Sequence, residues 1–167
     1  MRPDSVMKSA VGLALLVASA CASAQVPGLE KLNSVRLGLF LPSGSEARDA
    51  GKAWTSFGAD FDLKSLLKLG PIENTVVLSV DYYERGGVRS LPISANYKWT
   101  ALQFYGYVGA GFGFHRSGGS DSSGVGFQAG VGMPLGIGPL PTFVEAKYFQ
   151  SSDANVRGLA VYVGMKF

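Results

Sequence analysis

At 167 residues, the chain is long enough for one domain and not comfortably for two. Its formal net charge of +3, without a basic run or a basic patch interleaved with aromatic residues, argues against a nucleic-acid partner. Charged residues make up only 16% of the chain, whereas its 23 glycines are roughly double the average usage of about 7%. Glycine is unfavourable in helices and depleted in ordinary strands, so this composition favours a β-barrel, whose inward faces need small residues.

The N-terminal segment Met1–Ala24 is predicted to be a secretory signal peptide. Arg2 and Lys8 supply its basic start, Ala10 to Ala20 form a short apolar run, and Ala22-Ser23-Ala24 is a cleavage site of small residues. The apolar run is too short for a membrane-spanning helix, which needs about 20 residues. A buried N-terminal helix is the alternative interpretation of the same segment.

Cleavage would leave one domain, residues 25–167, with a formal charge of +2, because two basic residues and one acidic residue leave with the signal. The only cysteine, Cys21, would leave as well, so the mature chain would have no disulfide, no cysteine-based metal site and no cysteine nucleophile. Ala18-Ser19-Ala20-Cys21 also loosely resembles a lipoprotein processing site, with alanine where that pattern prefers leucine. Lipidation of Cys21 is therefore an alternative to simple cleavage.

Beyond Gln25 no second apolar run is long enough to cross a membrane as a helix, so a membrane protein would have to cross with strands. The strands of such a barrel appear as an even number of segments of about ten residues with alternating hydrophobicity. Eight such segments are predicted: Ser34–Pro42, Trp54–Leu63, Thr75–Glu84, Val88–Trp99, Gln103–His115, Gly124–Leu135, Pro141–Gln150 and Arg157–Phe167. The predicted fold is all-β, an eight-stranded antiparallel up-and-down transmembrane β-barrel.

Each predicted strand has one face of large apolar residues and one face of polar residues or glycine, because successive side chains point to opposite sides. In the first strand, for example, Val35, Leu37 and Leu39 oppose Arg36 and Gly38. A soluble sandwich or a lipocalin-like soluble barrel also alternates, so alternation alone does not decide. However, a soluble barrel would here have a core of small and charged groups, whereas apolar bulk outside and polar groups inside suit a membrane.

The predicted inward faces carry balanced charges, four basic and four acidic. These residues are Arg36, Lys98, Lys147 and Lys166, with Asp60, Asp62, Asp81 and Glu145. An eight-stranded barrel is only wide enough for its own side chains, and buried charges need partners. We therefore expect a paired polar plug in the lumen and not an open pore.

The connections differ between the two ends of the predicted barrel. The joins after odd-numbered strands include three polar segments, which would face the outside of the cell if both termini are periplasmic: Ser43–Ala50, Ser117–Ser123 and Ser151–Asn155. The joins after even-numbered strands are two short turns, Thr100–Leu102 and Gly136–Leu140, and a longer segment, Lys64–Asn74. Aromatic girdles are expected from Tyr97, Trp99 and Phe104 at the inner rim and from Tyr82 and Phe114 at the outer rim.

The last third of the chain, Gly124–Phe167, carries a resemblance to a known family. A glycine-rich segment is followed by Val144-Glu145-Ala146-Lys147-Tyr148, and the chain ends on alternating apolar residues with Phe167 last. In both respects it resembles the OmpA/OmpX-like family of small outer-membrane β-barrels. The resemblance implies the outer membrane of a Gram-negative cell, contact with outer-membrane lipid and lipopolysaccharide, recognition of Phe167 by the barrel-assembly machinery, and a monomer. It implies no single activity, because one fold hosts many functions.

His115 is the only histidine, and Ser117 follows two residues later. This His-x-Ser pair resembles that of the lipid A deacylases, eight-stranded barrels that use His, Ser and Glu. Their pair lies on the seventh strand and their glutamate on the last, whereas here the seventh strand has Lys147 and no histidine, and the last has no acidic residue. A nucleophile needs a base oriented by a third group. We therefore expect His115 to be a rim residue leading into a loop, and we expect no catalytic residue.

Two other patterns suggest sites but favour simpler interpretations. Asp60 and Asp62 share a face and could share a proton or bind a metal, but charge pairing inside the barrel explains them better. The glycines of Gly109–Gly113 alternate along a strand and are not followed by Lys-Ser/Thr, so they are not a phosphate-binding loop. Packing of inward glycines against rings such as those of Tyr105 and Tyr107 explains them better.

The sequence therefore predicts a structural or surface-interaction barrel with exposed loops, without a cofactor or metal. Two alternatives remain open at this point. One is an outer-leaflet lipid-modifying enzyme similar to the lipid A deacylases, and the other is a small solute channel.

Overall fold

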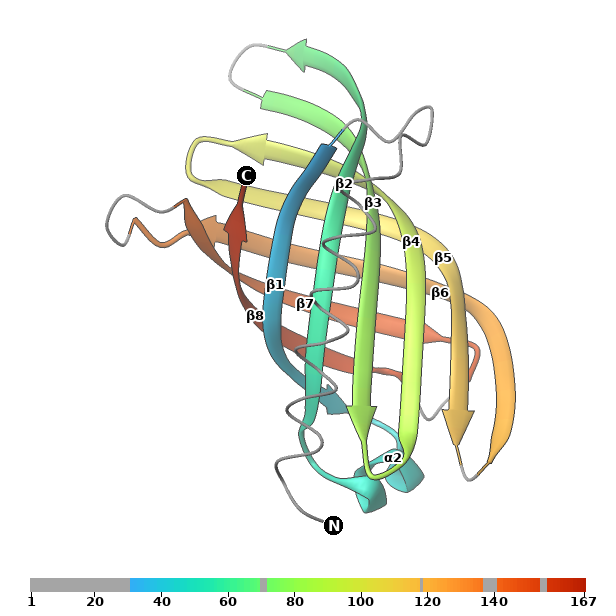
Figure 1. Ribbon diagram of the computed structural model, residues 1–167. Helices are drawn as coiled ribbons and strands as arrows, with labels where there is room; N and C mark the ends of the chain where they lie inside the picture. The colour runs from blue at the N-terminus through green and yellow to red at the C-terminus, as the bar shows by residue number, and fades with distance from the viewer. Residues whose placement is uncertain (1–30, 70–71, 118, 137–140, 154–155) are drawn as a thin grey trace.

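The computed structural model describes residues 31–69, 72–117, 119–136, 141–153 and 156–167, and these form an eight-stranded β-barrel with one short helix (Figure 1). The elements are β1 (Lys31–Pro42), α2 (Ser45–Ala50), β2 (Trp54–Leu69), β3 (Ile72–Arg85), β4 (Val88–Ala101), β5 (Phe104–Ser117), β6 (Ser120–Pro134), β7 (Thr142–Ser151) and β8 (Gly158–Lys166). The predicted signal peptide Met1–Ala24, with Cys21, lies outside the described residues. Within the described ranges, no helix is both long enough and apolar enough to cross a membrane.

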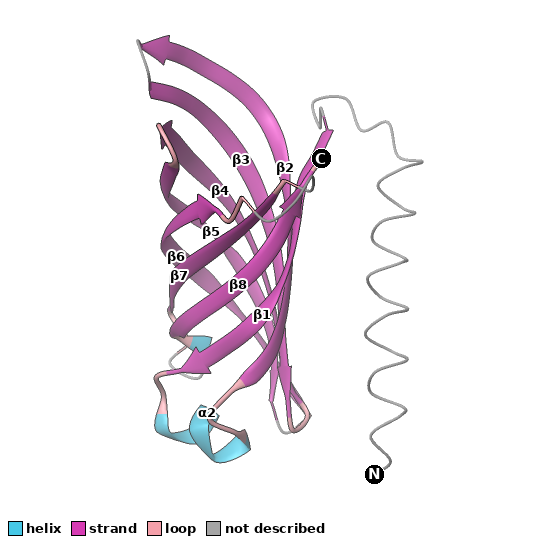
Figure 2. Cartoon of the chain, turned by 90° about the vertical axis from the view of Figure 1, so that its left-hand side faces the viewer, coloured by secondary structure: helices cyan, strands magenta, loops and turns pink. Residues whose placement is uncertain are grey.

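The sheet closes on itself, because β8 pairs with β1 as well as with β7. All eight pairings are antiparallel, and strands adjacent in the chain are adjacent in the barrel. One end of the barrel holds α2 and the β3–β4 turn, and we call it the loop end; the other holds the start of β1 and the end of β8, and we call it the terminal end (Figures 1 and 2). Closure leaves no unpaired sheet edge. The predicted fold is confirmed.

The hairpin between β2 and β3 differs from the sequence-based expectation. The segment Lys64–Asn74, expected to be one long turn, is mostly strand, because β2 runs to Leu69 and β3 starts at Ile72. The paired ends of these strands reach past the rest of the barrel at its terminal end (Figure 2). Two register shifts in β2 between Asp62 and Leu67 explain the error. Such irregularities interrupt the regular pairing on which the alternating pattern of a strand depends.

The loops of the loop end are shorter or more ordered than expected. The segment Ser43–Ala50 contains helix α2. Most of Ser117–Ser123 belongs to strands, because β5 ends at Ser117 and β6 begins at Ser120. Residues 154–155 of the expected loop after β7, and residues 137–140 of the turn after β6, lie outside the described residues.

The two faces of the sheet have the predicted composition. Large apolar side chains on the outer faces of β1 and β4–β8 are exposed; Val131 and Val163, for example, are 63% and 56% exposed. The corresponding side chains of β2 and β3, such as Phe57 and Leu78, are half-buried. The inner face is buried, and it consists mainly of polar side chains, glycines and aromatic rings. Apolar bulk therefore lies outside the barrel and polar groups lie inside it.

Glycines on the inner face make room for rings on the neighbouring strand. Tyr105 of β5 faces Gly132 of β6 in register, and a Cβ atom added to Gly132 would lie 2.1 Å from the ring carbon Cζ. Tyr107 and Gly130 form the next such pair, with a corresponding separation of 2.4 Å. The predicted packing of inward glycines against tyrosines is confirmed for these pairs. It explains why a chain with this many glycines folds into ordered strands.

Candidate functional site

The centre of the barrel holds an ionic cluster built from four strands. Arg36 of β1 reaches Asp60 of β2 (Nη1 to Oδ2, 2.6 Å) and Asp81 of β3 (Nη2 to Oδ1, 2.8 Å). Its Nε lies 3.7 Å from Oε1 of Glu145 on β7, and Lys147 of the same strand donates a hydrogen bond to Asp81. All five residues are at most 4% exposed. We call them the ionic centre; it contains two cations and three carboxylates and so has a formal charge of −1.

Hydroxyl groups satisfy the remaining oxygen atoms of the ionic centre. Glu145 accepts hydrogen bonds from the hydroxyls of Tyr105 and Tyr107, each at 2.8 Å. Asp60 accepts from Ser34 at 3.0 Å and from Ser79 at 2.6 Å. A buried charge is costly unless it is both paired and hydrogen-bonded. These contacts meet both conditions, so the centre is a rigid part of the fold.

A chain of amides extends the cluster across the lumen. Gln128 of β6 donates to Asn96 of β4 at 2.7 Å, and Asn96 donates to Ser79 of β3 at 2.8 Å. Ser79 in turn donates to Asp60. Hydrogen bonds arranged in series polarise one another and fix side chains in one arrangement. Side chains from opposite walls thus meet in the middle of the barrel.

The other three predicted inward charges lie nearer the terminal end and are half-buried. The Nζ atoms of Lys98 and Lys166 lie 4.3 Å and 5.2 Å from the centroid of the Tyr105 ring. Asp62 accepts a hydrogen bond from Asn33 at 2.7 Å. The eight charged residues predicted to lie inside the barrel therefore divide into two groups: five form a tightly paired centre, and three lie more loosely at the terminal end.

Asp60 and Asp62 do not form the carboxylate pair that their spacing allows. Asp60 pairs with Arg36, whereas Asp62 pairs with Asn33. Within the described ranges, no group of three or more His, Cys, Asp or Glu side chains is arranged to hold a metal ion. The glycines of Gly109–Gly113 lie within strand β5 and not in a turn.

An aromatic layer fills the barrel between the ionic centre and the loop end. Phe40 stacks on Tyr83 with a centroid separation of 4.3 Å, and Trp54 and Phe149 pack around them. Ala47 of α2 closes this layer from the loop end. This layer was not predicted from the sequence. The sequence carried a signal for it, because Trp54 lies two residues before the inward Ser56 and Tyr83 lies two residues after the inward Asp81, so both rings lie on the inner face.

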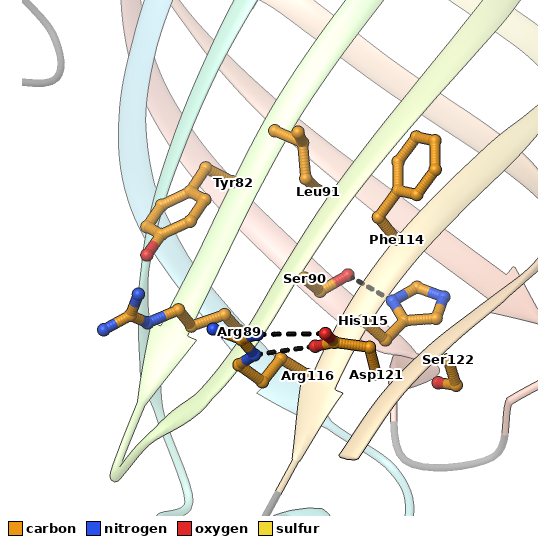
Figure 3. A pocket seen from close by; sticks show the side chains of 9 residues that line it. All are labelled: Tyr82, Arg89, Ser90, Leu91, Phe114, His115, Arg116, Asp121 and Ser122. Carbon is orange, nitrogen blue, oxygen red and sulfur yellow. Dashed lines mark hydrogen bonds and ion pairs between the residues drawn. The ribbon is translucent and has the colours of Figure 1, made fainter. Parts of the chain in front are cut away.

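His115 lies two residues before the end of β5 at the loop end, as expected for a residue leading into a turn, but its side chain is buried, 4% exposed. Its hydrogen-bonding neighbours are two other serines and not Ser117. The Oγ of Ser90 lies 2.9 Å from its Nδ1, and the Oγ of Ser151 lies 3.5 Å from its Nε2. Figure 3 shows Ser90 and His115 side by side on neighbouring strands. Both serines are at most 2% exposed, although Ser90 and His115 also line a cavity near the loop end.

Together, the closed sheet, the apolar outer face and the ionic centre define a small eight-stranded barrel of inverted polarity. Among solved structures, the chain is similar to the crystal structure of the outer membrane enzyme PagL, with a TM-score of 0.51 and 15% sequence identity. The match covers 80% of this chain and 97% of PagL. No protein-family model and no curated protein sequence matches the chain. At this identity the similarity is one of fold, and it does not transfer an activity.

Proposed function

We propose that the protein is a monomeric, integral outer-membrane β-barrel of structural or surface-interaction type, related in pattern to the OmpA/OmpX-like barrels. The observation that carries this proposal is the exposed apolar outer face. Soluble monomers rarely expose contiguous apolar patches larger than a few hundred Å². Here 22 large hydrophobic side chains of the described residues are exposed, and they surround a lumen of buried charges. Lipid is the solvent that suits this arrangement.

The lumen supports a closed barrel over a solute channel. The ionic centre and the aromatic layer follow one another along the barrel axis. Tyr162 links them, because its ring packs in the aromatic layer and its hydroxyl, which accepts a hydrogen bond from Ser56 at 2.6 Å, points to the ionic centre. Tyr162 also donates to Asp81 at 3.3 Å. Side chains at both levels are almost fully buried, so the described part of the chain leaves them no contact with bulk water. We expect no conductance steps from the intact protein in a planar bilayer.

The proposed orientation places the terminal end in the periplasm and the loop end outside the cell. Short turns lie at the periplasmic end of such barrels, and longer loops face outward. The C-terminal Phe167 is 69% exposed at the terminal end, where its backbone N–H donates to the carbonyl of Asn33 at 2.9 Å. An exposed terminal phenylalanine is available to the barrel-assembly machinery, as the family resemblance implies.

Cell fractionation combined with gel mobility tests the proposal. The protein is expected in the outer-membrane fraction, and an unheated sample is expected to migrate differently from a boiled one, because a closed barrel resists unfolding by detergent. Recovery as a soluble periplasmic protein without a mobility shift would contradict the proposal and favour a lipocalin-like barrel.

An outer-leaflet lipid-modifying enzyme is the second candidate. The fold similarity to the enzyme PagL and the Ser90–His115 contact support it. An assay of acyl release from lipopolysaccharide tests it, with His115→Ala, Ser90→Ala and Ser117→Ala as variants. No acyl release by the unmodified protein rules this candidate out. Release that is lost in His115→Ala alone or in both His115→Ala and Ser90→Ala replaces the first proposal.

A further inference from the structure

The outer wall near the loop end carries a row of four charged side chains that the ionic centre does not use. Glu84 of β3 faces Arg89 of β4, Arg89 faces Arg116 of β5, and Arg116 faces Asp121 of β6. The four side chains are 36% to 66% exposed. The two-residue turn Gly86-Gly87, whose φ angles of 58° and 85° suit glycine, holds Glu84 and Arg89 opposite one another. We call these four residues the charged row.

The charged row lies at the boundary between the apolar wall and the loop end. Arg89 lies two residues before the outward apolar residue Leu91, and Arg116 lies two residues after the outward apolar residue Phe114. Leu91 and Phe114 are 37% and 52% exposed and face each other in register. Two residues of strand span about 7 Å. The arginines therefore lie about 7 Å beyond Leu91 and Phe114 along their strands, which would be the depth of the lipid headgroups in the proposed membrane location.

The two arginines are held unequally. Arg116 makes a bidentate pair with Asp121, with Nε to Oδ1 at 2.6 Å and Nη2 to Oδ2 at 2.9 Å. Arg89 has only a long contact from Nε to Glu84 at 3.6 Å, and the hydroxyl of Tyr82 donates to the other oxygen of Glu84 at 2.7 Å. In the part of the chain that the structure describes, the terminal nitrogens of Arg89 make no hydrogen bond. Like charges directly opposite one another across two strands are unfavourable unless an anion lies between them.

A cavity of about 390 Å³ lies at these arginines. Its lining combines Arg89 and Arg116 with the apolar side chains of Leu91 and Phe114 and the ring of Tyr82 (Figure 3). Asp121, which pairs with Arg116, also lines the cavity, as do Ser90, His115 and Ser122, so a phosphate would replace the Asp121 carboxylate at Arg116. A guanidinium group presents a planar fork of donors that matches a phosphate group. The charged part of the cavity therefore suits a phosphate, and the apolar part suits the hydrocarbon attached to it.

We propose that the cavity between Arg89 and Arg116 binds the phosphate group of a membrane lipid whose hydrocarbon lies along Leu91 and Phe114. The acids at both ends make the row electrically neutral, so it does not attract free anions strongly. A lipid has the additional apolar contact that a free phosphate lacks. The inference rests on the proposed membrane location and names the lipid chemistry that the wall selects.

Lipid retention by the folded protein tests the inference. The full chain is folded in a neutral maltoside detergent and mixed separately with a phosphatidic acid, with a diacylglycerol of the same chain length and with inorganic phosphate. Native mass spectrometry counts the bound molecules. We expect phosphatidic acid to be retained at least about tenfold more strongly than diacylglycerol, because only phosphatidic acid offers a charged group that accepts hydrogen bonds from the guanidinium groups.

Matched variants separate the cavity from general charge. The double variant Arg89→Gln/Arg116→Gln is expected to lose most of this preference, and Arg89→Lys/Arg116→Lys to lose part of it, because lysine keeps the charge without the fork. The control Lys52→Gln/Arg85→Gln removes the same charge from exposed residues of the loop end and is expected to retain it. Equal retention in the first variant and in the control overturns the inference. So does binding of inorganic phosphate as strongly as the lipid, or binding of diacylglycerol as strongly as phosphatidic acid.

Heat-modifiable mobility is recorded for every sample, so that the two proposals fail differently. If the protein is a folded barrel in the membrane fraction but does not prefer the phosphate lipid, the inference alone is wrong. If the protein is soluble and shows no mobility shift, both proposals are wrong.

Discussion

Arg36 and Arg116 make nearly the same contacts in opposite surroundings. Arg36 reaches Asp60 and Asp81 at 2.6 Å and 2.8 Å inside the barrel, and Arg116 reaches the two oxygens of Asp121 at 2.6 Å and 2.9 Å on its outer wall. The interior side chains are 1% to 6% exposed, whereas those of the outer pair are 55% and 66% exposed. Distances alone therefore do not show which ion pair contributes more to the stability of the fold.

The difference lies in what replaces a lost partner. Water hydrates an exposed carboxylate when its arginine is removed, so an exposed pair contributes little to stability. The carboxylates around Arg36 are almost fully buried, so removal of that arginine leaves uncompensated buried charge. The interior pair is therefore necessary to the fold, while the outer pair remains free to exchange its partner for a ligand.

The largest effect is expected from Arg36→Met. The substitution changes the formal charge of the ionic centre from −1 to −2 and leaves Asp60 with hydroxyl partners only. Removing one partner of a buried pair typically costs about 3–5 kcal/mol. Urea unfolding in lipid vesicles, followed by heat-modifiable mobility, measures the free energy of unfolding. If Arg36→Met lowers the free energy of unfolding no more than Arg116→Met does, the interior pair is not more important to the fold than the outer pair.

A second substitution is expected to restore part of this loss. Arg36→Met with Asp60→Asn leaves one cation and two carboxylates in the ionic centre, so its formal charge returns to −1. Contacting residues of one network typically show coupling energies of about 0.5–3 kcal/mol. The double variant should therefore be more stable than the sum of the two single variants predicts. Simple additivity would show that Arg36 acts through packing and not through its charge.

A smaller effect is expected from Gly58→Ala, which leaves every charge in place. An added Cβ atom would lie 2.5 Å from Nε of Arg36 and 2.5 Å from Oδ1 of Asp81, so the pair must shift. Overpacking of a filled interior typically costs about 1–3 kcal/mol. The control is the same substitution in the Arg36→Met background, where half of the clash is absent. An equal loss of stability in both backgrounds would show that the alanine disturbs the strand itself.

The sequence was sufficient for the fold because each strand carries its own signal. The alternation of Val161, Val163 and Met165 with Tyr162 and Gly164 identifies both faces of β8 without reference to any other strand. It fails only where the backbone departs from regular pairing, as at the register shifts of β2. The inward position of each charge could be predicted in the same way.

The partners of the interior side chains could not be predicted, because they depend on the stagger between strands. Arg36 and Asp81 are separated by 45 residues and meet only through the register of the closed sheet. His115 illustrates the same limit: the serine nearest to it in the chain is Ser117, whereas the register brings Ser90 to its ring. The charged row also results from register, since its members come from four strands.

The smallest effect is expected from Arg116→Met in vesicles of phosphatidylcholine. The exposed pair with Asp121 is screened by salt, whose Debye length falls from about 30 Å at 0.01 M to about 3 Å at 1 M. We expect the urea midpoint to match that of the unmodified protein at high salt and to fall slightly at low salt, whereas the loss in Arg36→Met should be similar at both.

Adding phosphatidic acid to the vesicles sharpens the comparison. If Arg116 exchanges Asp121 for a lipid phosphate, the unmodified protein should gain stability from the added lipid, and the Arg116→Met variant should not. A gain that is equal in both would mean that the lipid stabilises the barrel without the arginine, and that Arg116 remains an ordinary surface ion pair.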